Sequence, residues 1–297
     1  MKKTILMFAG LVMTFSAVSH AEDCQQAITL YTSKAIQTAA SPQLAIEKAK
    51  QIVDLCPHVA DFQMAYASTL QKAGQYSQAL AVWKTAKGLT YSAGLNAQVQ
   101  QYKRAEIALN TLEVQLQLKQ RIDAQLSLDD LKEDYFNTTM SPELTKFVPR
   151  YQQLRQQFND QMTTQPFNAQ ELQTFVQTKR TLSVEAPEIS YQIAFDFNQS
   201  QPNIEGMQVL DQVAKSLADS QFQTIQVIGH TDQQGDDAYN LKLSQRRAES
   251  VVQLLQRSQP QLKGHLQAIG KGKTELLAHG TTEQDYRLNR RVAFIFK

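Results

Sequence analysis

The first third of the chain carries apolar residues at the spacing of α-helices. Around 65–67 they recur every three or four positions, the run stops at 74–76, and a second run continues through Ala79, Trp83 and Ala86. Such a period places apolar side chains on one face of each helix, and the interruption predicts a turn between two helices. We therefore expect a helical N-terminal domain over residues 22–120.

A long apolar stripe follows, and then a polar segment. From 95 to 116 the apolar positions fall on one side of a helix, although residues 112–118 also alternate, which leaves a strand there as an alternative. Residues 121–186 are rich in glutamine and read as a mostly helical polar connector. Asn168 with Glu171 three positions later is typical of a capping box that opens a helix.

The last part of the chain changes from helical spacing alone to strands that alternate with helices. Apolar residues alternate with polar ones over 191–197, which predicts a half-buried strand. The rest of the order is a helix over 204–217, a strand over 224–228, a helix over 238–256, and strands over 266–269 and 292–296. A β-α-β-α-β-β order predicts helices packed on a small mixed sheet, so the fold class is α+β overall.

The two N-terminal helices resemble a tetratricopeptide repeat. The pattern consists of small residues at fixed offsets, at Ala65, Gly74, Tyr76, Ala79 and Ala86. In that family small residues let two antiparallel helices pack closely, and a shift of 34 positions superposes a second, less complete copy. Two copies are fewer than the three that such arrays usually need, so a plain helical bundle remains the alternative.

The N-terminus has the order of a cleavable signal peptide. Lys2 and Lys3 precede a short apolar run from Ile5 to Val18, and 19–21 offers small residues for cleavage. The run is shorter than the roughly 20 residues that span a bilayer. We expect residues 1–21 to be removed and the mature chain to have no transmembrane segment; an uncleaved signal anchor is the alternative.

The predicted secretion bears on the chemical state of the two cysteines. In an oxidising compartment Cys24 and Cys56 predict one disulfide rather than a metal site, and a hairpin of the repeat type would bring them together. The residues before Cys24 do not have the pattern of lipoprotein processing. Without residues 1–21, 28 of the 30 Lys+Arg remain against 28 Asp+Glu, which argues against nucleic acid as a partner.

Three stretches near the C-terminus stand out: FDFNQS at 195–200, GHTDQQGDDAYNLKLSQRRA at 229–248, and RLNRRV at 287–292. In this order and spacing they closely resemble the OmpA-like domain that outer-membrane porins, peptidoglycan-associated lipoproteins and flagellar stator proteins share. The resemblance covers residues 187–297. It implies non-covalent binding of peptidoglycan.

Asp232 and Arg247 are the principal candidate ligand-binding residues. A guanidinium binds a carboxylate through two parallel hydrogen bonds, and a carboxylate accepts from an ammonium, so the pair suits a zwitterion. In the family the matching residues hold diaminopimelate of the wall's stem peptide. From the sequence alone an internal salt bridge between the two is the simpler interpretation.

The resemblance adds supporting residues. Asn240 and Thr231 match polar contacts beside the main pair, and Asn289 with Arg290 matches the segment that closes one side of the pocket. After 270–272 the chain lacks a proline that many members have, which predicts a differently shaped loop at the rim.

No catalytic motif or ligand spacing for a metal occurs in the sequence, and no cofactor is predicted. We therefore expect a protein that is not an enzyme, located in the periplasm of a Gram-negative bacterium, wall-bound and associated with the outer membrane. The predicted function is to anchor an envelope protein or assembly to peptidoglycan, with a protein partner for the helical N-terminal domain. The alternative is a periplasmic scaffold or assembly factor whose helical repeats and C-terminal domain bind proteins rather than wall.

Overall fold

The computed structural model describes residues 21–91, 96–136, 140–182, 186–196, 198–219 and 222–297. The chain divides into two compact units, one of Met1–Gln120 with Asp129–Phe147 and one of Arg121–Leu128 with Val148–Lys297. The predicted signal peptide lies outside the described residues apart from Ala21, and so do Leu95 and Phe197. The division into the four predicted segments stays a prediction.

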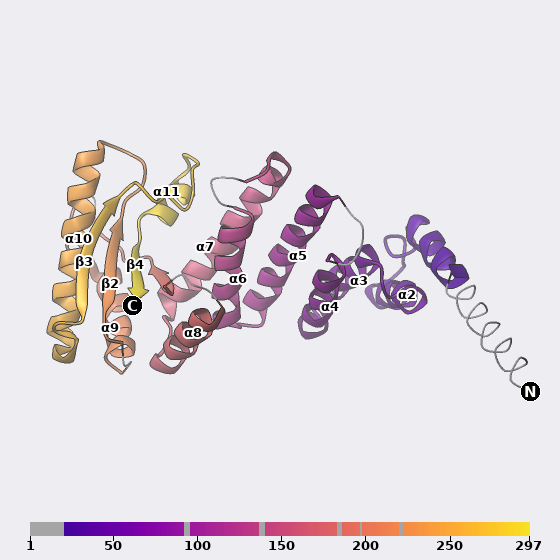
Figure 1. Cartoon of the computed structure of the whole chain (residues 1–297), viewed down its shortest axis with the longest axis horizontal. Helices are drawn as coiled ribbons and strands as arrows, with labels where there is room; N and C mark the ends of the chain where they lie inside the picture. Colours follow the sequence, from indigo (N-terminus) through magenta and orange to yellow (C-terminus); the bar gives the residue numbers. More distant parts are fainter. Residues whose placement is uncertain (1–20, 92–95, 137–139, 183–185, 197, 220–221) are drawn as a thin grey trace, which may run out of the picture. The chain divides into compact units, whose positions relative to one another are not determined.

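The first unit is built of helices (Figure 1). A helical segment at residues 21–32 is followed by α2 (Pro42–Leu55), α3 (Ala60–Lys72), α4 (Tyr76–Leu89) and α5 (Ala97–Gln117). Cys24 and Cys56 form the predicted disulfide, with a Cα–Cα distance of 4.8 Å. The bond joins the first helical segment to the residue that ends α2.

Local sequence explains the helix ends and the close packing of this unit. The Ser41 hydroxyl caps α2 by accepting a bond from the Leu44 amide at 3.2 Å. Gly74, between α3 and α4, has a φ of +75°, which glycine adopts without strain. Ala79 and Ala86 on α4 are fully buried, so the two helices approach closely. The resemblance to a tetratricopeptide repeat stays a prediction.

The long helix and the connector follow the predicted helical pattern. α5 continues through 112–117, so the strand alternative at that place is wrong, and Val114 and Leu116 are buried on the helix. α6 (Arg121–Asp134) and the short η1 (Pro142–Phe147) come next, and α6 contributes residues to both units.

Two helices precede the sheet in the second unit. They are α7 (Val148–Thr164) and α8 (Ala169–Leu182). The capping box at the start of α8 is confirmed, because the Glu171 amide donates to Asn168 at 2.9 Å and the Asn168 amide donates to Glu171 at 3.0 Å. Arg121 also donates to the Glu171 carboxylate at 2.6 Å, which fixes the first residue of α6 to this corner.

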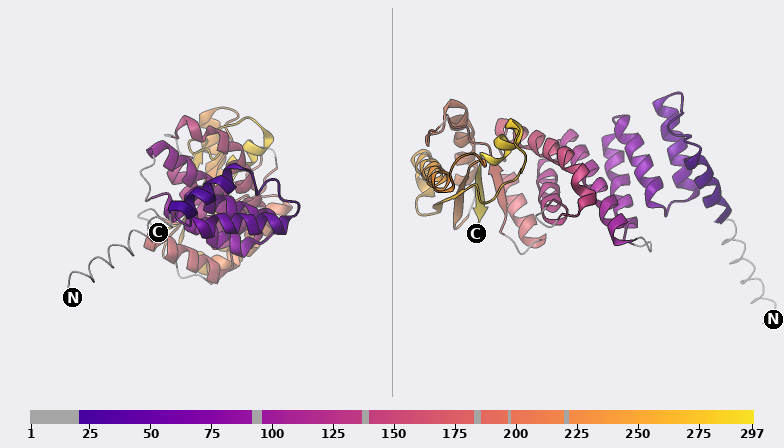
Figure 2. Two further views of the ribbon diagram at one scale, coloured as in Figure 1. Left: turned by 90° about the vertical axis from the view of Figure 1, so that its right-hand side faces the viewer. Right: turned by 90° about the horizontal axis from the view of Figure 1, so that it is seen from above.

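The sheet of the second unit is small and mixed, as predicted. Its elements in chain order are β1 (Glu188–Tyr191), α9 (Ile204–Ala218), β2 (Ile225–His230), α10 (Asp237–Ser258), η2 (Pro260–Leu262), β3 (Leu266–Gly272), α11 (Glu283–Asn289) and β4 (Val292–Phe296). The strand order is β1-β4-β2-β3, with β2 and β3 parallel and β4 antiparallel to both its neighbours. α10 packs alongside β2 and β3 (Figures 1 and 2).

Three details of this unit differ from the prediction. The strand expected over 191–197 ends at Tyr191, because the Ile193 amide turns back to donate to the Tyr191 carbonyl. Helix α11 was not predicted, although its start at Thr282 carries a capping box with Asp285. Helical spacing places Leu241 on the same face as the buried Ala248 and Leu255, but Leu241 is half exposed and Leu243 is buried instead.

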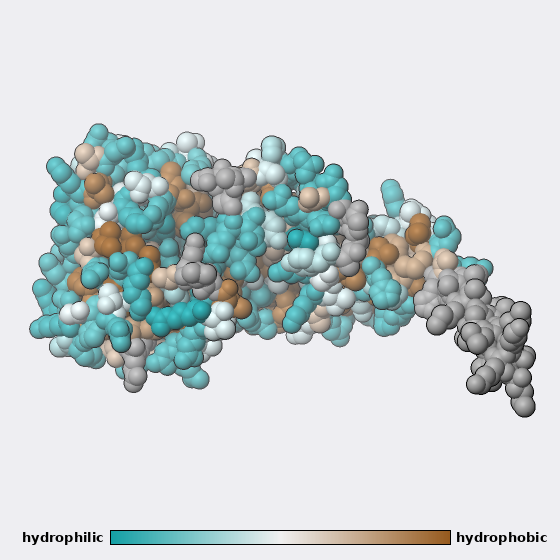
Figure 3. Space-filling view, viewed as in Figure 1, coloured by the Kyte–Doolittle hydropathy of each residue, from teal (hydrophilic) through white to brown (hydrophobic). Residues whose placement is uncertain are grey.

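The core of this unit lies between the sheet and α9 and α10. Val227 and Phe294 at its centre have no exposed surface, and the rings of Tyr191 and Phe294 meet edge to face with centroids 5.6 Å apart. The viewed face in Figure 3 is mostly hydrophilic, with separate apolar patches. Among the described helices none is long and apolar enough to cross a membrane.

Candidate functional site

The candidate residues gather where β2 ends and α10 begins. A Cβ at Gly229 would lie 2.3 Å from the Ser244 carbonyl oxygen, and one at Gly270 would lie 2.4 Å from the Gln245 nitrogen. Only glycine lets the backbone of α10 approach β2 and β3 so closely. Asp236 caps α10 by accepting from the Tyr239 amide at 3.1 Å.

Asp232 lies in the loop between β2 and α10 and is mostly buried, with 9% of its surface exposed. One carboxylate oxygen accepts from the Gln234 amide at 3.0 Å, and the other pairs with an Arg290 terminal nitrogen at 2.9 Å. A carboxylate has about four acceptor positions, so these two bonds leave room for another donor. The salt bridge of Asp232 is thus made with Arg290 and not with Arg247, the partner that the simpler interpretation of the sequence gave it.

Arg247 is the other principal candidate, and it is 7% exposed. Its Nε donates to the Gln199 carbonyl at 3.1 Å, and its guanidinium lies over the Phe195 ring, 4.6 Å from the centroid. Within the described residues its two terminal nitrogens make no hydrogen bond. Burial lowers the pKa of Arg247, and repulsion from Arg290 lowers it further. A carboxylate placed between the two guanidinium groups would relieve both effects.

Arg290 connects the loop to helix α11. Besides Asp232, it pairs with the Glu283 carboxylate at the start of that helix. Burial acts to lower the pKa of Arg290, but its bonds to Glu283 and Asp232 outweigh burial, so the pKa lies above its ordinary value. Both acidic partners therefore hold this side chain in its charged form.

Arg247 and Arg290 line one cavity of about 430 Å³ in the second unit. Its walls come from the segment after β1 and from α7, α9, α10 and α11, through Thr163, Gln192, Ile193, Ala194, Phe195, Glu205, Val209, Arg247, Glu283, Arg287 and Arg290. Asp232 is outside this lining and reaches it through its ion pair with Arg290. Glu205, Glu283 and Arg287 are charged groups at the cavity that the sequence analysis missed.

The supporting residues Asn240, Asn289 and Thr231 do not line the cavity. Asn240 and Asn289 instead hold the surrounding loops by hydrogen bonds. Asn240 donates to the Gln234 carbonyl at 2.6 Å, across the turn that contains Gly235. The fully buried Asn289 accepts from the Leu277 amide at 2.7 Å and donates to the Ala278 carbonyl at 2.7 Å. A direct contact of Asn289 with a ligand would require such bonds to break.

Thr231 has a different environment. Its amide donates to the Gly272 carbonyl at 2.9 Å, but its buried hydroxyl oxygen has no hydrogen-bond partner within the described part of the chain. The loop after Gly272, where the family's proline is absent, is held by Asn289 and by Gln233, whose amide donates to the Gly280 carbonyl.

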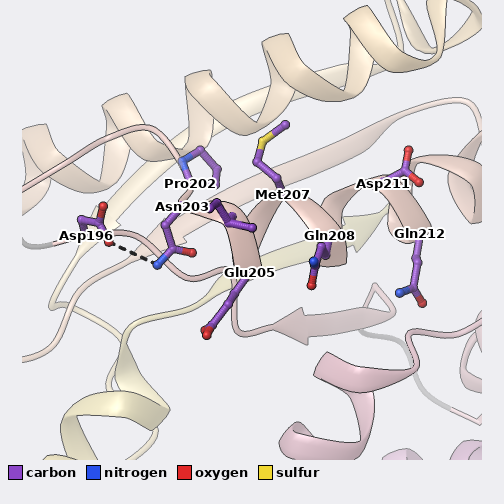
Figure 4. Close-up of a pocket in the computed structure, with 9 residues that line it drawn as sticks. Asp196, Pro202, Asn203, Glu205, Met207, Gln208, Asp211 and Gln212 are labelled. Atoms are coloured by element: carbon purple, nitrogen blue, oxygen red, sulfur yellow. Dashed lines mark hydrogen bonds between the residues drawn. The ribbon is translucent and has the colours of Figure 1, made fainter.

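A second and larger groove, of about 1020 Å³, runs along the outside of α9 (Figure 4). Asn203 caps this helix and donates to Asp196 at 3.2 Å, and Glu205 lines both this groove and the cavity. In Figure 4 Glu205, Gln208 and Gln212 point to one side of α9 and Met207 to the other. Within the described ranges, no group of three His, Cys, Asp or Glu side chains is placed to hold a metal ion.

The sequence of this region matches a known family. Residues 194–290 match the OmpA family model. The chain carries an OmpA family domain. That domain includes β2, α10, β3 and α11, and it contains all six candidate ligand-binding residues, whose assignment remains a prediction.

Relatives and solved structures resemble the same part of the chain. Outer membrane protein A of Bordetella avium is 42% identical over 98 residues, which are 33% of this chain and 50% of that protein. The peptidoglycan-associated lipoprotein of Buchnera aphidicola is 34% identical over 105 residues, 35% of this chain and 60% of that protein. The chain thus spans between half and two thirds of these relatives, and the OmpA family domain is the shared part.

The solved peptidoglycan-associated lipoprotein of Burkholderia pseudomallei is 30% identical and covers 36% of this chain and 89% of its own. Its TM-score is 0.33. The family assignment therefore rests on the sequence matches.

Proposed function

We propose that the OmpA family domain binds peptidoglycan without covalent chemistry and anchors an envelope protein or assembly to the cell wall. The observation that carries the proposal is the buried Arg247, which lines a polar cavity and keeps its two terminal nitrogens unbonded within the described residues. Relatives that match the same region are named peptidoglycan-associated lipoproteins, which supports the ligand class.

The ligand group we propose is the zwitterionic end of diaminopimelate. Its carboxylate would lie between Arg247 and Arg290, whose mutual repulsion it offsets, and its ammonium would bind Asp232. The ammonium would use an acceptor position of Asp232 that its bonds to Gln234 and Arg290 leave open. Glu283 already pairs with the other terminal nitrogen of Arg290 and can retain that side chain.

Modest affinity at each site is sufficient for anchoring. A charge-assisted hydrogen bond contributes about 1.5–3 kcal/mol, and many identical sites along a polymer reinforce one another. We place the protein in the periplasm of a Gram-negative bacterium, wall-bound beside the outer membrane, on the same reasoning.

We propose a protein partner for the first unit. Large apolar side chains are exposed there at Ile28, Tyr31 and Leu44. A photo-crosslinking residue at Ile28 in cells should capture an envelope protein, and the same residue at the exposed Lys50 should not. Equal labelling at the two positions, or none at either, would contradict this part of the proposal.

Co-sedimentation with diaminopimelate-containing sacculi tests wall binding. Wild type should sediment with the sacculi, and Arg247→Ala and Asp232→Ala should stay in the supernatant. Arg246→Ala is the matched control, because it removes the same side chain at the exposed neighbouring position and should sediment as wild type does. Circular dichroism melting of each variant separates lost binding from lost folding.

If folded Arg247→Ala and Asp232→Ala both sediment as well as wild type, the pocket assignment is wrong. If wild type itself stays in the supernatant, the better interpretation is the scaffold, in which the C-terminal domain binds protein rather than wall.

A further inference from the structure

The wall of the cavity extends beyond the OmpA family domain. Thr163, at the end of α7, and Gln192, just after β1, both line the cavity that contains Arg247, and both lie outside the matched residues 194–290. α7 contacts β1 and α11 within the second unit, and its Asp160 lies 3.6 Å from Arg287 of α11. Helix α7, which lies outside the OmpA family domain, therefore forms part of the cavity wall.

Gln192 has an unused hydrogen-bond acceptor. Its side chain is 8% exposed, and its amide nitrogen donates to the Arg287 carbonyl at 3.3 Å. Its carbonyl oxygen Oε1 is buried and has no partner within the described residues. Buried acceptors are normally satisfied, so one that is left open beside a cavity points to a donor supplied by a ligand.

Thr163 adds a second acceptor. Its hydroxyl donates to the Asn159 carbonyl of its own helix at 2.8 Å, so the oxygen lone pairs of Thr163 are what it can offer to a ligand. Gln192 and Thr163 thus present acceptors without a formal charge, whereas the other end of the cavity presents the guanidinium groups of Arg247 and Arg290.

We propose that Gln192 and Thr163 form a second subsite that accepts a hydrogen bond from an amide N–H of the stem peptide. The inference rests on the proposed function, because the zwitterionic end of diaminopimelate occupies the arginine end of the same cavity. The amide that joins diaminopimelate to the rest of the peptide then reaches Gln192. A cavity of about 430 Å³ lies within the range of about 300–1,000 Å³ typical of ligand sites.

Titration calorimetry of the full chain with three soluble ligands tests the subsite. The ligands are free diaminopimelate, a stem tripeptide that ends in diaminopimelate, and the same tripeptide attached to its disaccharide. Gln192→Met should bind the tripeptide about tenfold more weakly and Thr163→Val about threefold more weakly, as expected for loss of one hydrogen bond. Neither change should alter the affinity for free diaminopimelate.

Thr164→Val is the matched control. Thr164 is the exposed neighbour of Thr163, and its hydroxyl also donates to carbonyls of its own helix. It should bind all three ligands as wild type does, which separates the subsite from an effect on helix stability.

Each other outcome has a definite meaning. Equal losses for free diaminopimelate and tripeptide, or no loss for either, would overturn the subsite. A loss confined to the disaccharide-bearing ligand would assign the donor to the acetamido group of a sugar and contradict the peptide assignment. If wild type binds none of the ligands, the proposed function fails and the subsite with it.

Discussion

The α3–α4 hairpin of the first unit and the β2–α10 corner of the second unit both rely on small residues for close packing, but they bury different chemistry. The hairpin buries Ala79, Ala86 and Trp83, whose indole nitrogen donates to Gln71 at 3.0 Å. The corner buries the polar Asn240 and Arg247 beside its glycines. Buried polar groups cost free energy unless they are bonded, so a helix that buries several of them indicates a binding role rather than a stabilising one.

The largest effect on stability should come from the disulfide of the first unit. Replacing Cys24 and Cys56 by serine opens a loop of 32 residues in sequence separation, which costs about 3–4 kcal/mol in the chain-entropy description. Trp83 is the only tryptophan, so its fluorescence follows urea unfolding of the first unit alone. Reductant should lower the wild-type midpoint and leave that of the double variant unchanged; an unchanged wild-type midpoint would contradict the prediction.

Two glycine substitutions, one in each unit, should change the free energy of unfolding in opposite directions. Gly229→Ala forces α10 away from β2 and should destabilise the second unit by about 1–3 kcal/mol, because the new Cβ meets backbone. Gly88→Ala, in α4, meets nothing within 4 Å and should stabilise the first unit by about 0.5–1 kcal/mol. Thermal unfolding followed by ellipticity measures both changes. If both variants are stabilised, or both are destabilised, the predicted difference between the units is wrong.

Loss of a hydrogen-bonded side-chain amide should also have different costs in the two units. Asn289→Ala removes three hydrogen bonds to the loop after Gly272 and one to Gln233, and it leaves the backbone partners unpaired, so it should cost about 2–3 kcal/mol. Gln71→Ala removes only the bond to Trp83 and should cost about 1 kcal/mol. Urea unfolding of the two variants decides this, and a larger cost for Gln71→Ala would be the contrary result.

The smallest effect is a pH dependence from Arg291. Burial lowers the pKa of Arg291 to about 10 in the folded protein, below its ordinary value of 12.5. The unfolded chain holds this proton more tightly, so the group disfavours folding at neutral pH, and that penalty shrinks as pH rises above about 10.

Wild type should therefore gain stability relative to Arg291→Met by at most about 1.4 kcal/mol for each pH unit above about 10. Urea unfolding of both proteins at about pH 9 and about pH 11 measures the difference. If the difference in stability between the two proteins is the same at both pH values, or if Arg291→Met gains relative to wild type, the pKa of Arg291 in the folded protein is not lowered.

Local sequence predicted the fold of the second unit well where the pattern was periodic or carried a cap. The β4 strand and the start of α8 are as expected, because alternation and the Asn168–Glu171 box act over a few residues. The end of β1 was mispredicted because a turn at Ile193 interrupts a pattern that continues in the sequence. Helix α11 was missed although the capping box at its start was present.

The candidate site was only partly accessible from sequence. The motif placed Asp232 and Arg247 in one corner, but their actual partners, Arg290 for Asp232 and the Gln199 carbonyl for Arg247, depend on contacts between distant segments. Thr163 and Gln192 could not be found from the motif, because their approach to the cavity follows from how α7 packs on the domain.

The central claim is that Arg247 and Asp232 recognise a zwitterion. Titration calorimetry with two stem tripeptides, one ending in diaminopimelate and one ending in lysine, tests it most directly, because lysine lacks the second carboxylate. Wild type should bind the diaminopimelate peptide at least about tenfold more tightly, as one charge-assisted hydrogen bond implies, and Arg247→Ala should bind both equally weakly. Equal affinity of wild type for the two peptides would contradict the account.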